Sequence, residues 1–212
     1  MDTSNFVITI GRQVGAGGYD TARALSREFG IKAYDYELLD EVAKKCGIST
    51  EILRRSDEKA SKRGLLSFFG FRAISHVNES MVASDIMSDD GLFRVQSDVI
   101  LQLAEKESCI IIGRCSDYIL RDNPRTVNVF ISACMESRVK RIMKGRGLSE
   151  SEAVKFIEVN EKKRADYYNY FTFKKWGDSS SYDLCIDSSK LDDDENKVVE
   201  VIKDYMKTRG LI

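Results

Sequence analysis

The 212-residue sequence has a single histidine, His76, and its five cysteines include no CxxC pair. These counts favour neither a disulfide framework nor a zinc site, and they indicate a reducing cytosol. Cys109 and Cys185 lie in apolar runs, and we interpret them as small core residues rather than redox groups. His76 has no second ligand or base partner, and we assign it no role.

The sequence also lacks long apolar stretches and an excess of charge of either sign. Its only early apolar run, residues 6–10, is too short for a signal-peptide core or a membrane span. Lysine and arginine total 33 against 34 aspartate and glutamate residues, which gives no reason to expect a nucleic acid or a membrane as partner. We expect a soluble, cytoplasmic protein in which any anion site comes from local clustering.

The sequence does contain short apolar, β-branched runs separated by longer segments with helical spacing. This alternation predicts a parallel sheet covered by helices on both faces. After the first run, apolar residues recur at helical spacing up to Phe29, and Gly30 follows where a C-cap glycine belongs. One domain over residues 1–212, with inserted lobes, fits this length better than two domains. The runs are residues 6–10, 31–34, 109–112, 127–131 and 184–186.

Further helices are predicted at residues 36–45, 49–59, 73–87 and 92–107. Gly91 is expected to separate the last two. The stripe Ile74, Val77 and Met81 indicates a core or homodimer contact. Residues 61–71 mix basic and aromatic side chains, and a loop packed under a neighbouring lobe is favoured over one that binds a partner or a membrane.

A charged stretch follows in residues 136–163. Ser149 and Glu152 have the spacing of a capping box, which predicts a helix from there to about Tyr168. The helices on either side leave residues 145–147 as a hinge.

The turn at residues 12–18, Arg-Gln-Val-Gly-Ala-Gly-Gly, lies between the first predicted strand and its helix. Glycines allow the positive φ angles and close approach that a nest of backbone N–H donors needs. The helix N-terminus adds donors and a favourable dipole, so the turn is predicted to cradle the phosphates of a nucleoside triphosphate. The alternative is a turn that only joins strand to helix. The predicted nucleotide-binding residues are Gly15, Ala16, Gly17, Gly18, Tyr19, Asp20 and Thr21.

This turn departs from the Walker A pattern GxxxxGK[ST]. With Gly17 as the second glycine of the pattern, Arg12 stands at the first and Gly18 replaces the phosphate-binding lysine. Asp20 or Thr21 is the expected substitute for the hydroxyl that binds Mg²⁺. We predict that Arg12 substitutes for the lysine, whose charge normally stabilises the transferring phosphoryl group.

Several segments carry a family resemblance when they are taken in order. They are residues 8–12 with 15–18, Tyr34-Asp35, residues 111–114, residues 130–133 leading into Arg138 and Arg141, and residues 161–168, 176–178 and 182–184. Together they resemble the cytidylate-kinase-like family of P-loop proteins. The resemblance implies a P-loop NTPase-type three-layer α/β sandwich with a parallel, roughly five-stranded sheet. It also implies a helical acceptor-binding lobe at about residues 36–90 and a helical, arginine-bearing lid at about residues 145–176.

Phosphoryl transfer needs charge neutralisation and alignment more than a nucleophilic side chain, so arginines are the expected machinery. Arg114 ranks first because it follows a buried strand end, where ligands of open α/β sheets bind. Arg138 and Arg141 share a helix face, which suits either phosphate contact or a solvated basic surface. The candidate catalytic residues are Arg12, Arg114, Arg138, Arg141, Arg146 and Arg164.

The resemblance also assigns acceptor contacts. Glu161 and Arg164 match an acidic residue and an arginine that bind the monophosphate, although an intrahelical ion pair is an alternative. Asp35 is placed to contact the acceptor's sugar or base, or else it caps a helix. The predicted acceptor-binding residues are Asp35, Arg114, Glu161 and Arg164.

Two departures leave the base specificity open. Cys115 stands where cytidylate kinases have an aspartate that helps to read cytosine, and Glu41 stands where they have an acceptor-lobe arginine. The hypothesis is transfer of the γ-phosphoryl group of Mg-ATP to a nucleoside monophosphate or a similar small phosphorylated acceptor. A catalytically silent nucleotide-binding regulator and a kinase of another small metabolite are the alternatives.

Overall fold

The computed structural model describes residues 5–35 and 89–212, which form two compact units. One unit comprises residues 5–34 and 103–212, and the other is represented by Asp35 and residues 89–102. The expected acceptor lobe and lid stay predictions. Outside the described residues lie the helices expected at 36–45, 49–59 and 73–87, the loop at 61–71, Glu41, His76 and the stripe Ile74, Val77 and Met81.

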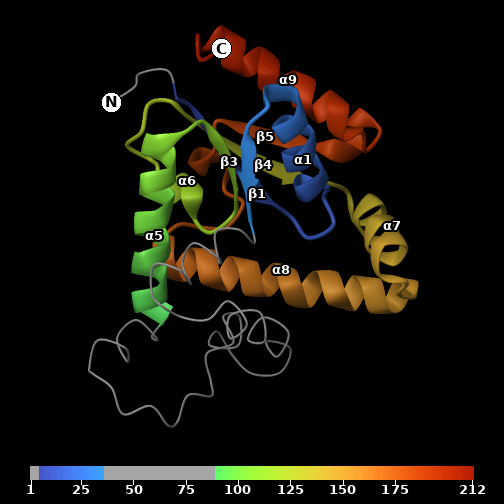
Figure 1. Ribbon diagram of the computed structural model, residues 1–212. Helices are drawn as coiled ribbons and strands as arrows, with labels where there is room; N and C mark the ends of the chain where they lie inside the picture. The colour runs from blue at the N-terminus through green and yellow to red at the C-terminus, as the bar shows by residue number, and fades with distance from the viewer. Residues whose placement is uncertain (1–4, 36–88) are drawn as a thin grey trace. The chain divides into compact units, whose positions relative to one another are not determined.

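The larger unit is built on a sheet whose described strands run in the order β2-β3-β1-β4-β5 (Figure 1). Ile10 of β1 pairs with Ile112 of β3 and with Val129 of β4, and all these pairings are parallel. The predicted fold class is confirmed, and every predicted apolar run is a strand. The strands are β1 (Val7–Arg12), β2 (Lys32–Tyr34), β3 (Cys109–Ile112), β4 (Thr126–Ser132) and β5 (Leu184–Asp187).

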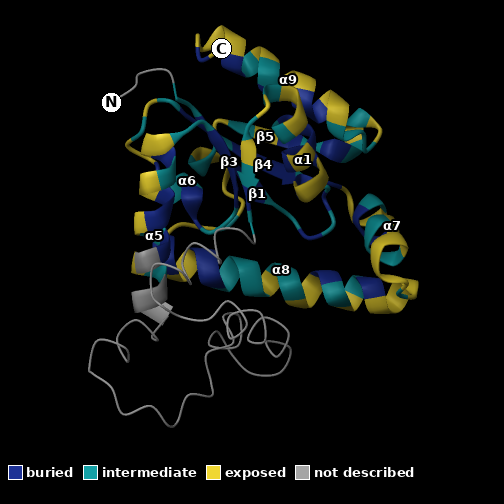
Figure 2. Ribbon diagram, viewed as in Figure 1, coloured by how far each residue is buried: buried dark blue, intermediate teal, exposed yellow. Residues whose placement is uncertain are grey.

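The inner strands are buried on both faces, which explains why their sequences do not alternate with polar residues (Figure 2). Helices α1 (Gly18–Phe29) and α9 (Glu195–Thr208) pack together on one face, and α6 (Ser116–Ile119) lies on the other (Figure 1). Leu25 and Ile202 are fully buried in the core between sheet and helices. Each contributes about 1.5–3 kcal/mol by leaving water.

A second, smaller apolar cluster brings two further helices to the glycine turn. Val14 packs with Val139 of α7 and with Ala153 and Ile157 of α8. The turn is therefore held by side chains far from it in sequence. The remaining elements are α5 (Asp89–Lys106), α7 (Met135–Arg146), α8 (Glu150–Thr172), η2 (Ser179–Ser181) and η3 (Ser188–Leu191).

Helix α8 begins at the predicted capping box, where the N–H of Ser149 donates to Glu152 at 2.9 Å, and it extends past Tyr168 to Thr172. The predicted hinge is wrong in extent, because α7 continues through Arg146 and only Gly147, with a φ of 66°, leaves the helix. The guanidinium of Arg146 lies 4.4 Å from the ring centroid of Phe156 in α8, which helps to hold the last turn of α7 in place.

Two further expectations are wrong. Gly91 lies in the first turn of α5 rather than before the helix, and a helix tolerates one glycine at a cost of at most about 1 kcal/mol. Cys185 is exposed because β5 is an edge strand, whereas Cys109 of the inner strand β3 is buried as expected. In the part of the chain that the structure describes, no helix is both long and apolar enough to cross a membrane.

Candidate functional site

The glycine turn leaves β1 at Arg12 and enters α1 at Gly18. Gly15 and Gly17 have φ angles of 80° and 83°, which residues with a side chain rarely adopt. A Cβ atom on Gly15 would lie 2.9 Å from the carbonyl oxygen of Arg138. Gly15 is therefore required by the close approach of α7 as well as by its own backbone conformation.

Five carbonyl groups of the turn accept hydrogen bonds from side chains, most of which come from elsewhere in the chain. Helices α7 and α8 supply guanidinium groups, and η3 supplies a hydroxyl. The bonds run from Arg164 Nη1 to Arg12 O (2.9 Å), Arg138 Nε to Val14 O (2.8 Å), Arg141 Nη1 to Gly15 O (2.6 Å), Ser188 Oγ to Ala16 O (3.1 Å) and Thr21 Oγ1 to Gly17 O (3.1 Å).

These bonds also set the direction of the N–H groups in the turn. In a trans peptide the N–H and C=O groups point in opposite directions. The carbonyls of Val14, Ala16 and Gly17 are directed to their side-chain donors. The N–H groups of Gly15, Gly17 and Gly18 consequently face the other way, at the N-terminus of α1. Successive N–H groups presented at a helix N-terminus form the kind of backbone nest to which phosphate binds in proteins.

One ion pair with little exposure holds the backbone of Val14 on both sides. Oε2 of Glu161 accepts the N–H of Val14 at 2.8 Å and the guanidinium of Arg138 at 2.7 Å. The other carboxylate oxygen accepts the indole N–H of Trp176 at 3.0 Å. Arg138 is only 7% exposed, so the solvated-surface alternative is wrong for this residue. Arg138 and Glu161 instead fix the shape of the turn.

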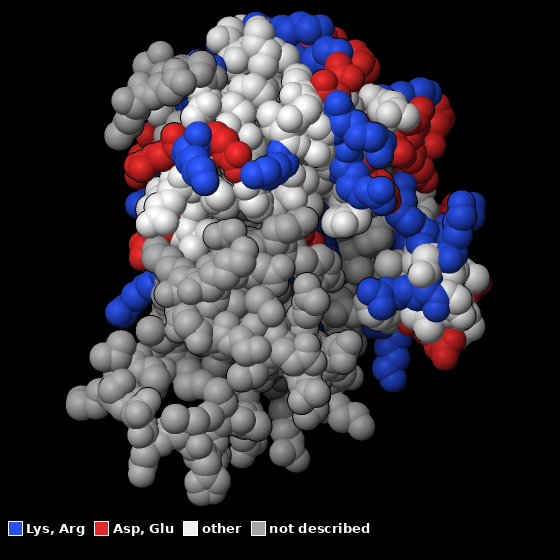
Figure 3. Space-filling model, in the orientation of Figure 1, with Lys and Arg blue, Asp and Glu red and all other residues white. Residues whose placement is uncertain are grey.

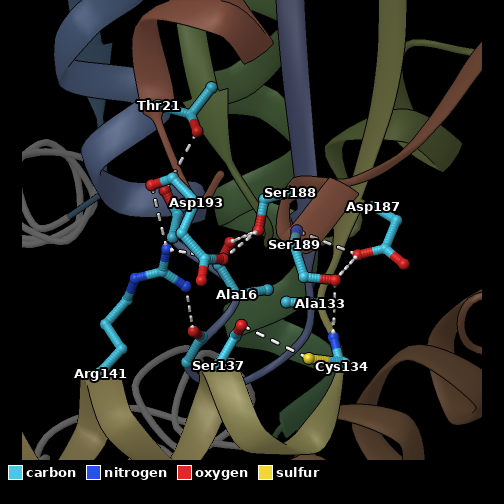
Figure 4. Close-up of polar contacts among 12 residues, drawn as sticks. Ala16, Thr21, Ala133, Cys134, Ser137, Arg141, Asp187, Ser188, Ser189 and Asp193 are labelled. Carbon is cyan, nitrogen blue, oxygen red and sulfur yellow. Dashed lines mark hydrogen bonds and ion pairs between the residues drawn. The ribbon is translucent and has the colours of Figure 1, made fainter. Parts of the chain in front are cut away.

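The loop after β5 is tied to the turn through Arg141, which reaches from α7 toward Asp193 in Figure 4. Its guanidinium lies 3.3 Å from the carboxylate of Asp193 while it donates to the carbonyl of Gly15. Ser188 donates to Ala16 and lies 3.4 Å from the same carboxylate. The loops that follow the carboxyl ends of β1 and β5 are thereby joined by side-chain contacts.

The side chain of Arg12 runs from the start of α1 to the loop after β3. Its Cβ and Cγ lie 2.7 and 2.8 Å from the position that a Cβ on Gly18 would occupy, and its Nη1 lies against Gly113. Because β1 and β3 are neighbours, this path follows the carboxyl edge of the sheet, where ligands of open α/β folds bind.

Arg114 follows β3 in an unusual backbone conformation. Arg114 and Cys115 have φ angles of 59° and 55°, a region that costs residues with side chains roughly 1–3 kcal/mol each. Burial raises the pKa of the Cys115 thiol. It also raises the pKa of the Asp117 carboxyl, which accepts the hydroxyl of Tyr168 at 2.7 Å. The loop that carries Arg114 is thus held to α8.

The remaining predicted residues have varied surroundings. Tyr19 and Asp20 are exposed in the first turn of α1. Arg146 stacks on Phe156 at the end of α7. Asp35 directly follows β2, at the start of the second unit.

Three residues that hold the turn were missed by sequence reasoning: Trp176, Ser188 and Asp193. Ser188 follows the last strand of a parallel sheet, and that position is a signal that could have found it, since ligand sites form at carboxyl strand ends. Trp176 falls in the closing segment of the family resemblance, which assigned it no role. Asp193 had no signal, because its contact with Arg141 depends on how α7 packs.

Charges of both signs lie side by side on the face in Figure 3. Lys203 pairs with Glu28, and Lys140 pairs with Glu136. Exposed pairs of this kind contribute at most about 1 kcal/mol each, and their fields largely cancel. This mixture agrees with the balanced composition.

Comparison with known proteins places this geometry in context. A family model described as the cytidylate kinase-like family matches residues 7–190. A cytidylate kinase of Methanopyrus kandleri is 26% identical over 204 residues, which are 92% of this chain and 91% of that protein. The crystal structure of an uncharacterized protein from Eubacterium ventriosum is 28% identical with a TM-score of 0.65, over 94% of this chain and 99% of the other. A shikimate kinase from Bacteroides thetaiotaomicron shares the fold, with a TM-score of 0.51 at 12% identity over 93% of this chain and 98% of its own.

Proposed function

We propose, because this chain belongs to the cytidylate kinase-like family, that it transfers the γ-phosphoryl group of ATP to a nucleoside monophosphate. Family and fold together support a phosphotransferase in general. The observation that carries the proposal is the nest of N–H groups at Gly15, Gly17 and Gly18, whose direction follows from the side chains bound to the turn's carbonyls. N–H groups fixed at a helix N-terminus bind phosphate without further reorganisation.

In this proposal the arginines have two kinds of role. Arg138, Arg141 and Arg164 bind carbonyls of the turn and act as positioning residues. Arg114, at the carboxyl end of β3, contacts the acceptor or the transferring phosphoryl group and offsets its charge. Asp35 binds the sugar or base of the acceptor.

Asp20 is the proposed protein ligand of the Mg²⁺ that accompanies ATP. The hydroxyl of Thr21 is buried and donates to the carbonyl of Gly17, whereas Asp20 is exposed one residue earlier. A carboxylate suits Mg²⁺, which otherwise binds phosphate oxygens and water. Asp20 would hold the ion, whose charge would offset that of the phosphates.

An acceptor screen tests the proposal. Purified protein with Mg-ATP is given each nucleoside monophosphate, and ADP formation is followed together with formation of the phosphorylated product. ADP should appear only with a suitable acceptor. Arg114→Ala should lower the rate about 10²–10³-fold, as expected for loss of a group that stabilises transition-state charge. Arg121→Ala, an exposed arginine after the same strand, is the matched control and should keep the rate. Failure to phosphorylate every monophosphate sinks the proposal.

Specific observations favour two other candidates. Cys115, in place of an aspartate, leaves room for a different small acceptor, and the same screen extended to other phosphorylated and hydroxylated metabolites tests that candidate. Gly18, in place of a lysine, favours a nucleotide sensor without turnover. Calorimetry separates this sensor from a kinase, because a sensor binds ATP tightly and forms no product with any acceptor.

A further inference from the structure

We infer that Arg12 delivers to the nucleotide phosphates the positive charge that a P-loop lysine supplies from position 18, and that Gly18 is a glycine because Arg12 needs its space. The inference rests on the proposed function for its substrate, a nucleoside triphosphate. In this chain, an arginine at position 12 and a glycine at position 18 together replace the glycine and lysine of the usual pattern. The positive charge is then moved to another residue rather than lost.

The first observation is the contact between Arg12 and Gly18. A Cβ on Gly18 would lie 2.7 Å from the Cβ of Arg12 and 2.8 Å from its Cγ. These atoms are at the base of the side chain, so they cannot move aside without moving the strand. Gly18 is the first residue of α1 and has no positive φ, so its backbone conformation does not by itself require glycine. Arg12 therefore excludes any side chain at the position of the Walker lysine.

The second observation is at the other end of the arginine. Gly113 has a φ of 71°, which by itself favours glycine, and a Cβ there would also overlap Nη1 of Arg12, so the guanidinium reaches this loop. The N–H of Gly113 donates to the carbonyl of Ile10 at 3.0 Å, which fixes the loop against β1. The guanidinium is thereby located between the start of α1 and the residue before Arg114.

The base of Arg12 is also fixed. Arg12 pairs with Ile131 of the parallel strand β4. The carbonyl of Arg12 accepts a hydrogen bond from the guanidinium of Arg164 at 2.9 Å. The stem of the side chain passes the start of α1, so its charge does not have to be ordered from a free side chain when the nucleotide binds. A planar guanidinium also matches two phosphate oxygens at once, which a lysine does not.

The position of the guanidinium implies a side of approach. In the sheet order, β3 is a neighbour of β1, so the side chain extends from the glycine turn toward the strand that leads to Arg114. Arg12 would therefore act on the γ-phosphate from the direction of the acceptor, where the phosphoryl group is transferred.

The test uses substitutions that separate charge from space. Arg12→Met keeps most of the stem and removes the charge, Arg12→Gly clears the space, and Arg12→Gly with Gly18→Lys rebuilds the pattern GxxxxGK. ATP turnover is measured with the best acceptor, and thermal unfolding checks that each variant is folded. Arg27→Ala, an exposed arginine near the other end of α1, is the control that should keep turnover.

Arg12→Met and Arg12→Gly should each lower turnover about 10²–10³-fold. The rebuilt pair should recover at least about tenfold over Arg12→Gly, since a lysine at this position is the usual P-loop cation. Gly18→Ala should lower turnover at least about tenfold when Arg12 is present. In the Arg12→Gly background, adding Gly18→Ala should change turnover by no more than about twofold relative to Arg12→Gly alone. Turnover of Arg12→Met within about threefold of the unmodified protein, or an equal effect of Gly18→Ala in both backgrounds, overturns the inference.

A binding measurement keeps this test separate from that of the proposed function. If no acceptor is phosphorylated, the proposed reaction fails, but calorimetry with ATP and with adenosine still tests Arg12. Arg12→Met should weaken ATP binding at least about tenfold and leave adenosine binding unchanged. Equal effects on both ligands, or no effect on ATP, would show that Arg12 does not bind the phosphates.

Discussion

At the scale of single residues, the backbone of Val14 is held by Glu161 through its N–H and by Arg138 through its carbonyl. The two side chains also pair with each other, and Arg138 is buried. Removing one partner of such a pair leaves the other charge in a poorly hydrated place, which costs much more than an exposed pair contributes. The shape of the glycine turn therefore depends on charges outside it.

Replacing Glu161 should expose this dependence. Glu161→Gln keeps the shape of the side chain but leaves Arg138 without its counter-charge, so the free energy of unfolding should fall by about 3 kcal/mol, the low end for buried pairs because Glu161 is partly exposed. Urea unfolding monitored by the fluorescence of Trp176, which contacts Glu161, measures the change. Glu158→Gln, exposed on the same helix, should have little effect, and equal losses in both variants would contradict the role of the pair.

Asp117 gives a prediction for pH. Burial raises the pKa of its carboxyl in the folded state, so the folded protein holds a proton that the unfolded chain has lost above about pH 4. Stability from this group is therefore present at low pH and is lost as the pH rises through the raised pKa. The urea midpoint is measured for the unmodified protein and for Asp117→Asn at each pH. The midpoint of the unmodified protein minus that of the variant should fall as the pH rises from about 4 to the raised pKa, and it should then level off. If this difference in midpoints rises with pH, or stays constant from about pH 3 to 8, Asp117 does not hold its proton in the folded state.

At the scale of elements, the end of α7 differs from the hinge that its two glycines predict. Gly145 is inside the helix, whereas Gly147 follows the end with a φ of 66°, and a Cβ on either glycine would meet no atom within 4 Å. Sequence alone could not separate these positions, since both are glycines beside Arg146. Only the backbone conformation tells a tolerated helix glycine from a required cap.

The two glycines should therefore respond in opposite ways to the same substitution. Gly145→Ala should raise the free energy of unfolding by about 0.5–1 kcal/mol, because alanine favours the helix interior. Gly147→Ala should lower it by about 1 kcal/mol or more, because alanine is strained at positive φ. Thermal and urea unfolding of the two variants measure the difference, and each serves as the control for the other. Destabilisation by Gly145→Ala would support the wider hinge.

At the scale of the whole molecule, the larger unit joins α7, α8 and the loop after β5 to one turn at the edge of its sheet. A ligand that binds this turn should stabilise the folded state as a whole, because the turn's contacts come from elements spread over the chain. Ligand binding raises stability by RT ln(1 + [L]/Kd), which is about 2.7 kcal/mol at a hundredfold excess over Kd.

Mg-ATP should accordingly raise the thermal midpoint of unfolding, and ADP should do so more strongly than adenosine at equal concentration. The reason is that the proposed contacts are to phosphate groups rather than to the base. Differential scanning fluorimetry with the three ligands measures the order. Equal shifts with adenosine and ADP would mean that the turn does not contribute to binding.

Much of the fold follows from local patterns. The strands appear wherever a short β-branched run lies between helical segments, and Gly30 and Ser149 mark helix ends correctly. The turn at Gly15 and Gly17 was also found, because the need for a positive φ is a property of the residue itself. The exposure of Cys185 could not be found from the sequence, because the order of the strands decides which strand is at the edge.

The sequence by itself determined the parallel sheet, the glycine turn and the family, since these depend on residue type and short-range spacing. Only the tertiary structure decided what each charged residue does. Arg138 and Glu161 hold Val14, and Arg12 reaches Gly113, across more than a hundred residues of chain in each case. The physical reason is that a guanidinium or a carboxylate has no local preference for its partner, so its role depends on which groups the packed helices and strands place beside it.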